Sequence, residues 1–163
     1  MAVRGPGVPQ GFQSDEVTGN IDIAATALRL AGATSDYRLD GRSLKPYWRD
    51  PFRVSRRPVE ISLLNVSGAV DELGGAVVSN KAPALRYKGF RVGPYKYVDY
   101  AAGGSELYDL DRDPQELDNV IDSPLYESVR EYMETWLPWV ADCSGSECRQ
   151  ELPVWPEPLE IVP

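Results

Sequence analysis

The first third of the chain carries one helical pattern of apolar and polar positions. Within residues 22–31, apolar side chains recur three or four positions apart, which places them on one face of a helix. Asp22 can cap the first turn, and Gly32 suits a left-handed conformation at the C-terminal end. A polar connection over 33–57, with a turn at Asp40-Gly41, follows the helix. The predicted apolar face consists of Ile23, Ala27, Leu30 and Ala31.

From Pro58 onward the pattern changes to that of strands. Val59, Ile61 and Leu63 alternate with polar positions, which is the period of a half-buried strand. Glycines at 89, 93 and 103–104 separate further short runs, and residues 68–75 are predicted to form a loop. Successive short strands joined by tight turns favour an antiparallel sheet. The predicted strands cover 59–63, 84–87, 90–92, 96–100 and 107–110.

After the last strand, two helix start signals follow. Asp113 supplies a capping side chain, with Pro114 and Glu116 at the first and third helical positions, which predicts a capped turn of helix. Ser123-Pro124 predicts the longest helix, to about residue 141. Its apolar stripe is typical of a helix that packs on one face of a sheet. The stripe consists of Leu125, Val129, Tyr132, Met133, Trp136, Leu137 and Val140.

Composition narrows the classes of function. The 163 residues include 42% hydrophobic side chains, enough for a globular domain with a real core. The net charge of −8 disfavours nucleic acid as a partner, and no apolar run reaches the ~20 residues that cross a bilayer. The chain contains no histidine, which excludes Ser-His-Asp and Cys-His catalysis and histidine-containing metal sites.

Few motifs point to chemistry. Asp109, Asp111 and Asp113 have the spacing that opens an EF-hand loop, but Pro114 and Val120 occupy its required Gly and Glu positions. We therefore interpret this run as a strand end and a cap. Two catalytic carboxylates of the glycosidase kind are conceivable, yet no pair has an apolar setting.

Three further local patterns have structural alternatives. Gly5-Pro6-Gly7 lacks the spacing of a dinucleotide fingerprint and predicts a turn. Asn65-Val66-Ser67 fits a glycosylation acceptor, a short motif that is common by chance. A basic stretch could meet a sulfate or phosphate ester, although such residues more often pair with surface acids. The stretch comprises Arg42, Arg49, Arg53, Arg56 and Arg57.

The two cysteines stand close together. Cys143 and Cys148 are separated by small and flexible residues that would let them close a tight loop. The spacing is not that of a CxxC redox motif, and zinc would need further ligands. Free thiols are the alternative. We favour a disulfide, and with it an extracellular or periplasmic location.

Six segments, in order along the chain, resemble the C-terminal part of the sulfatase family, notably bacterial-type arylsulfatases and N-acetylglucosamine-6-sulfatase-like enzymes. One departure is Ala25, where the family usually has proline. The segments are 3–9 (VRGPGVP), 20–33 (NIDIAATALRLAGA), 40–44 (DGRSL), 96–98 (KYV), 106–119 (ELYDLDRDPQELDN) and 143–149 (CSGSECR).

The resemblance implies an α+β fold in four parts. A remnant helix of an alkaline-phosphatase-like α/β catalytic domain would occupy 1–35, and a linker would cover 36–57. A small antiparallel sheet packed by one long C-terminal helix would form a subdomain over 58–149. A Pro-rich tail over 150–163 would lie extended on the surface.

The resemblance also implies where the chemistry lies. Sulfatases hydrolyse sulfate esters with a formylglycine made from Cys or Ser in a C/S-x-P-x-R motif, with a calcium ion, and with Lys and His on the sulfate. These groups precede the RGPG turn in the family, and neither Cys143 nor Cys148 is followed by x-Pro-x-Arg. No catalytic, cofactor-binding or metal-binding residue can therefore be assigned here.

Two functional hypotheses follow. In the first, the chain is an inactive C-terminal fragment of a calcium- and formylglycine-dependent sulfatase. Its partner would be the N-terminal catalytic domain, and the parent's substrate a sulfated carbohydrate or an aryl sulfate. In the second, the chain is a free-standing, non-catalytic binding or structural module with the same architecture.

Overall fold

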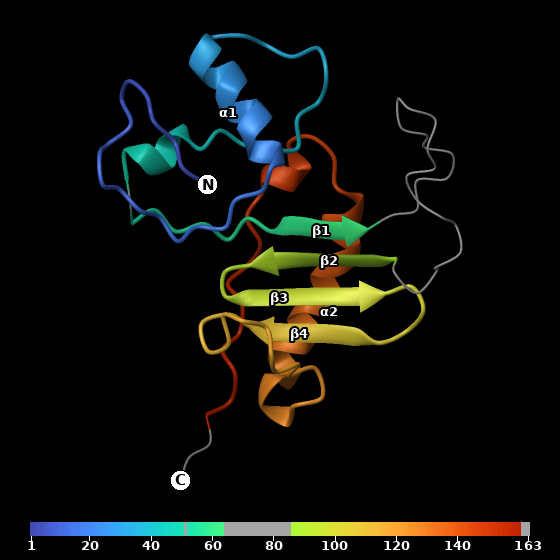
Figure 1. Ribbon diagram of the computed structural model, residues 1–163. Helices are drawn as coiled ribbons and strands as arrows, with labels where there is room; N and C mark the ends of the chain where they lie inside the picture. The colour runs from blue at the N-terminus through green and yellow to red at the C-terminus, as the bar shows by residue number, and fades with distance from the viewer. Residues whose placement is uncertain (51, 64–85, 161–163) are drawn as a thin grey trace, which may run out of the picture.

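The computed structural model describes residues 1–50, 52–63 and 86–160. It contains an antiparallel sheet of four strands in the order β1-β2-β3-β4. Figure 1 shows the long helix α2 (Glu127–Asp142) behind this sheet and the shorter helix α1 (Ile21–Ala31) beyond its β1 edge. The predicted small antiparallel sheet with one C-terminal helix is confirmed. None of the described helices has the length and apolar character that a membrane span requires.

Tight turns connect the last three strands. The strands are β1 (Val59–Leu63), β2 (Tyr87–Val92), β3 (Tyr95–Tyr100) and β4 (Ser105–Asp109). Gly93-Pro94 joins β2 to β3, and Gly103 and Gly104 adopt positive φ angles of 95° and 92° between β3 and β4. These turns are as predicted. The predicted loop over 68–75, the start of the predicted strand 84–87 and the acceptor Asn65 lie outside the described residues.

The prediction that Gly89 separates two strands is wrong. Gly89 lies inside the single strand β2, where it pairs with Val98 of β3. A Cβ atom at this position would stand 2.3 Å from the carbonyl oxygen of Tyr97. Gly89 therefore permits a close approach of two backbones within the sheet rather than a turn.

The core lies between the sheet and α2. Val129 and Met133 of α2 have no exposed surface, and neither have Phe90 and Leu107 of the facing strands. The predicted apolar stripe of α2 is confirmed, because all of its members either belong to this core or pack against it. The start signal at Ser123-Pro124 opens a short 3-10 helix, η3 (Pro124–Tyr126), which leads into α2.

The predicted helical turn at 113–116 is wrong. The segment forms a turn in which the Glu116 amide donates to the Asp113 carbonyl oxygen at 3.1 Å. Glu116 has a φ of 57°, in the left-handed region, so a right-handed helix cannot continue through it. The Asp113 carboxylate instead accepts the amide of Asp118 at 2.9 Å.

The C-terminal tail has no regular secondary structure over its described part, 150–160, but it is not wholly on the surface. Leu152 is buried in the core, and its amide donates to the Arg56 carbonyl oxygen at 3.0 Å. The Leu159 amide donates to the Leu125 carbonyl oxygen at 2.8 Å. The tail thus ties the segment before β1 to the start of α2.

Helix α1 faces the opposite way from its sequence pattern. Asp22, Ala25 and Thr26 are its buried side chains, whereas the predicted apolar face is exposed, with Ile23 at 54% and Leu30 at 52%. The predicted cap is also wrong, because the N-cap residue is Asn20 and Asp22 lies within the first turn. Gly32 does adopt the predicted left-handed conformation, with a φ of 66°.

Candidate functional site

Among the described residues, a group of polar contacts surrounds the buried carboxylate of Asp22. This side chain has no exposed surface, and its Oδ2 accepts Nη2 of Arg57 at 2.5 Å. Oδ2 also accepts the Gly19 amide at 3.0 Å, and Oδ1 accepts the Arg42 amide at 2.8 Å. The three donors replace the water that burial removes, so the charge is stable there.

Close backbone approach holds the polar connection against α1. A Cβ atom on Gly41 would lie 2.1 Å from the carbonyl oxygen of Ile21, so only glycine fits without a shift. The Thr26 hydroxyl donates to the Asp22 carbonyl oxygen at 2.7 Å and accepts the Leu44 amide at 2.9 Å. Residues 41–44 therefore lie along the first two turns of α1.

Three arginines of the basic stretch form ion pairs or hydrogen bonds within the protein. Arg57 pairs with Asp22, and Arg56 pairs with Glu151 at 3.4 Å on the surface. Arg42 donates to the Ser55 hydroxyl at 2.6 Å and to the Tyr47 hydroxyl. Arg56 thus pairs with a surface acid, as the structural alternative predicts, whereas the acid that pairs with Arg57 is buried.

Burial shifts two pKa values in this cluster. Burial lowers the pKa of Arg57, and the neighbouring Asp22 carboxylate opposes that shift. Burial raises the pKa of Glu16, whose carboxylate accepts the Ser55 amide at 2.9 Å. Among the described residues, Nε of Arg42 and Nε of Arg57 are buried without a hydrogen-bond partner. No sequence pattern marks Asp22 as buried, since its partner lies 35 positions away.

An open cavity of about 870 Å³ lies beside this cluster. Most of its wall comes from the N-terminal segment, and Leu44, Tyr47 and Trp48 close the other side. Its charged side chains are Arg4 and Glu16. One carboxylate and one arginine, which stays protonated, do not make a nucleophile–base pair. The predicted turn at Gly5-Pro6-Gly7 lies in this wall, closed by a Val8 amide to Gly5 carbonyl bond of 3.2 Å.

The acids at the end of β4 do not fit a calcium ion. The Asp109 carboxylate is buried, accepts the Tyr126 hydroxyl at 2.9 Å and pairs with Arg112 at 3.6 Å. Its oxygens are thus committed to donors within the protein. Within residues 1–50, 52–63 and 86–160, no three acidic or cysteine side chains are grouped as metal ligands.

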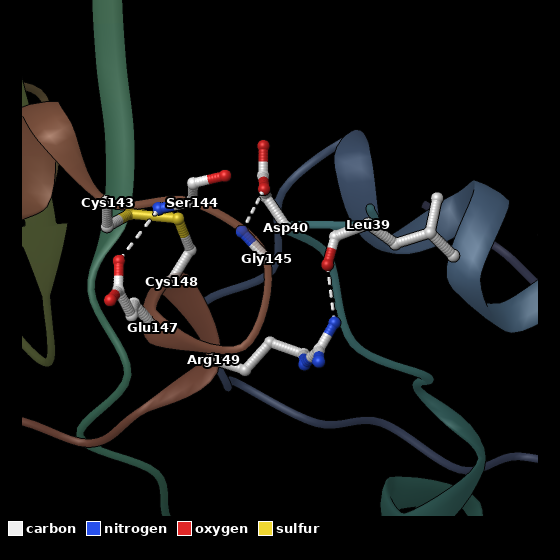
Figure 2. The surroundings of a disulfide bond; sticks show 8 residues. All are labelled: Leu39, Asp40, Cys143, Ser144, Gly145, Glu147, Cys148 and Arg149. Carbon is white, nitrogen blue, oxygen red and sulfur yellow. Dashed lines mark hydrogen bonds between the residues drawn. A yellow bond between two sulfur atoms is a disulfide. The ribbon is translucent and has the colours of Figure 1, made fainter. Parts of the chain in front are cut away.

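A formylglycine does not fit either. Cys143 and Cys148 form the predicted disulfide, with their Cα atoms 5.2 Å apart. Figure 2 shows this ring facing Leu39 and Asp40 of the polar connection. A cysteine held in a disulfide has no thiol to convert to an aldehyde, so no hydrolytic step can be derived from these residues.

Comparison with known proteins shows which family the chain is related to. No protein-family model matches the chain. Human arylsulfatase K is 31% identical over 123 residues, which cover 74% of this chain and 22% of the relative. Arylsulfatase K of the mouse is also 31% identical, over 129 residues that cover 74% of this chain and 21% of the relative. The chain belongs to the sulfatase family. It spans about a fifth of the length of these relatives and corresponds to a C-terminal portion of the family.

Solved structures show the same fold for this sulfatase chain. A protein crystallised with its substrate D-glucosamine-2-N,6-O-disulfate superposes with a TM-score of 0.63, at 21% identity over 87% of this chain and 26% of that protein. A protein of Bacteroides thetaiotaomicron assigned to the sulfatases superposes with a TM-score of 0.51, at 22% identity over 85% of this chain and 30% of that protein. These neighbours have the alkaline-phosphatase-like fold of sulfatases.

Proposed function

We propose that this chain is the non-catalytic C-terminal part of a sulfatase and that it buttresses a catalytic α/β domain. In this proposal, residues 1–35 belong to the catalytic domain, 36–57 link it to the subdomain 58–149, and 150–163 form a tail. The groups that break the ester bond, formylglycine and calcium among them, come from the rest of the enzyme.

The exposed side chains of α1 are the observation that carries the proposal. Ile21, Ile23 and Leu30 project from one helix, and Met1 and Val3 of the N-terminal segment are also exposed. A short helix rarely leaves its apolar side chains in water unless a neighbour covers them. We assign the rest of a sulfatase as that neighbour, because the chain spans only 22% of its human relative.

The complete protein, in this proposal, hydrolyses the sulfate ester of a sulfated carbohydrate or an aryl sulfate. The named relatives are arylsulfatases, and a fold neighbour was crystallised with a disulfated glucosamine as its substrate. The Cys143–Cys148 disulfide supports export to an oxidising compartment.

A turnover assay tests the proposed inactivity. The purified chain is incubated with 4-nitrophenyl sulfate, and separately with D-glucosamine-2-N,6-O-disulfate, with and without calcium. We expect sulfate release at the rate of the protein-free blank in every case. Release above the blank that co-elutes with the chain on size exclusion would overturn the proposal.

The alternative is a free-standing binding or structural module. The observation in its favour is that the sheet and α2 enclose a core of their own, in which Phe90, Leu107, Val129 and Met133 are fully buried. Such a core could fold without a catalytic domain. The first function requires another domain to cover the exposed apolar side chains of α1, whereas the free-standing module does not.

A further inference from the structure

The disulfide ring that follows α2 has a defined shape. The ring, Cys143–Cys148, places Gly145 at a φ of 62°, in the left-handed region. The Ser144 amide donates to the Glu147 carboxylate at 3.4 Å, and the 3-10 helix η4 (Glu147–Arg149) closes the ring. Serine and glycine fill most of the ring, so apart from these hydrogen bonds its shape depends on the disulfide.

The ring and Arg149 are hydrogen-bonded to a segment more than a hundred positions earlier in the chain. The Gly145 amide donates to Oδ1 of Asp40 at 2.6 Å, and the Arg149 guanidinium donates to the Leu39 carbonyl oxygen. Both hydrogen bonds are drawn in Figure 2. A hydrogen bond with a charged partner is about twice as strong as a neutral one.

Leu39 and Asp40, which are bonded to the ring, directly precede the residues that contact α1. Asp40 is followed by Gly41, which lies against the Ile21 carbonyl, and by Arg42, whose amide donates to the buried Asp22 carboxylate at 2.8 Å. Asp40, which is bonded to the ring, therefore lies only two positions before Arg42, which is bonded to the buried carboxylate of α1.

We propose that the disulfide ring is a redox-sensitive clasp that holds the N-terminal end of α1 against the sheet subdomain. A dithiol opens it by thiol–disulfide exchange. The S–S bond takes up two electrons and two protons, Cys143 and Cys148 become thiols, and the dithiol becomes its own cyclic disulfide. Gly145 then leaves its fixed conformation, the Asp40 carboxylate loses the Gly145 amide, and the contacts of residues 41–44 with α1 open more often.

Amide hydrogen exchange of the folded chain, with and without dithiothreitol, tests the clasp. We expect exchange at Arg42 and Leu44 to become about tenfold faster on reduction, the effect of one lost charge-assisted hydrogen bond. Amides of the central strand β3 should keep their rates. Unchanged rates at Arg42 and Leu44, or an equal increase in β3, would overturn the proposal.

Substitutions separate the clasp from a general effect of reduction. In the oxidised chain, D40A should accelerate exchange at Arg42 as reduction does, and D40N should have a smaller effect because its amide oxygen can still accept. D36A, which changes an exposed acid of the same connection, is the matched control and should have none. Equal rates in D40A and D36A would contradict the clasp. The readout needs no sulfatase activity, so its failure would leave the proposed function standing.

Discussion

Asp22 lies at a position with no exposed surface and joins α1 to three other parts of the chain. Three donors meet its carboxylate, and one of them is the guanidinium of Arg57, itself only 2% exposed. Removal of one member of a buried ion pair leaves the other charge without compensation. Loss of either partner should therefore destabilise the seat of α1.

Arg57→Met tests this pair. The substitution keeps much of the side-chain volume but leaves the Asp22 carboxylate without its cation, so we expect the free energy of unfolding to fall by about 3–5 kcal/mol. Urea denaturation measures the change. Lys88→Met is the matched control, because Lys88 pairs with Asp142 at 3.6 Å on the surface, and it should cost under about 1 kcal/mol. Similar losses in both variants would contradict the account.

The raised pKa of Tyr132 predicts a loss of folding stability at high pH. Burial raises its pKa to about 12, with a smaller opposing effect of Arg56, and its hydroxyl donates to the Pro153 carbonyl oxygen at 2.8 Å. An unfolded tyrosine loses its proton near pH 10. The stability that depends on the neutral phenol is therefore fully present below about pH 10 and lost as the pH rises toward 12.

Tyr132→Phe should flatten that loss. Urea denaturation of both proteins from pH 9 to 12 measures the slope of the unfolding free energy, which should be less steep in the variant. Buried tyrosines such as Tyr95, whose pKa burial also raises, keep part of the slope. An identical slope in the two proteins would show that Tyr132 does not titrate differently on unfolding.

At the scale of elements, the regular patterns were readable and the exceptions were set by contacts distant in sequence. The period of α2 predicted both its length and its buried side, because a single helix face meets the sheet. Gly89 was misassigned to a turn, because its role depends on Tyr97 of a neighbouring strand. Glu116 was misassigned to a helix, because neither its neighbours nor its type predict a positive φ.

Gly89→Ala tests the corrected view of β2. The added Cβ would stand 2.3 Å from the Tyr97 carbonyl oxygen, so the two strands must separate locally. We expect a loss of about 1–3 kcal/mol in unfolding free energy, measured by thermal or urea denaturation. Gly5→Ala is the control, since its Cβ would meet nothing within 4 Å, and it should be neutral. A neutral Gly89→Ala would show that the approach is not tight.

At the scale of the whole molecule, short motifs revealed the family, and spacing predicted the disulfide. Cys143 and Cys148 are near neighbours, so their pairing could be predicted from small intervening residues. The pair of Asp22 with Arg57 could not, because only the folded path of residues 32–57 brings the two together. The helical period of α1 likewise showed an apolar face but not what would cover it.

The central claim is that the exposed face of α1 is built to be covered by the rest of a sulfatase. In the isolated chain, we expect two copies to associate through this face, because association removes its apolar side chains from water. A double variant, I23K/L30K, places charges on the face without touching the buried side chains of α1. L117K changes an even more exposed leucine outside α1 and serves as the control.

Sedimentation velocity over a range of protein concentrations tests this claim most directly. We predict that the wild-type chain and L117K self-associate as concentration rises, whereas I23K/L30K stays monomeric with an unchanged circular dichroism spectrum. A wild-type chain that is monomeric and cooperatively folded at every concentration would contradict the claim and favour a free-standing module.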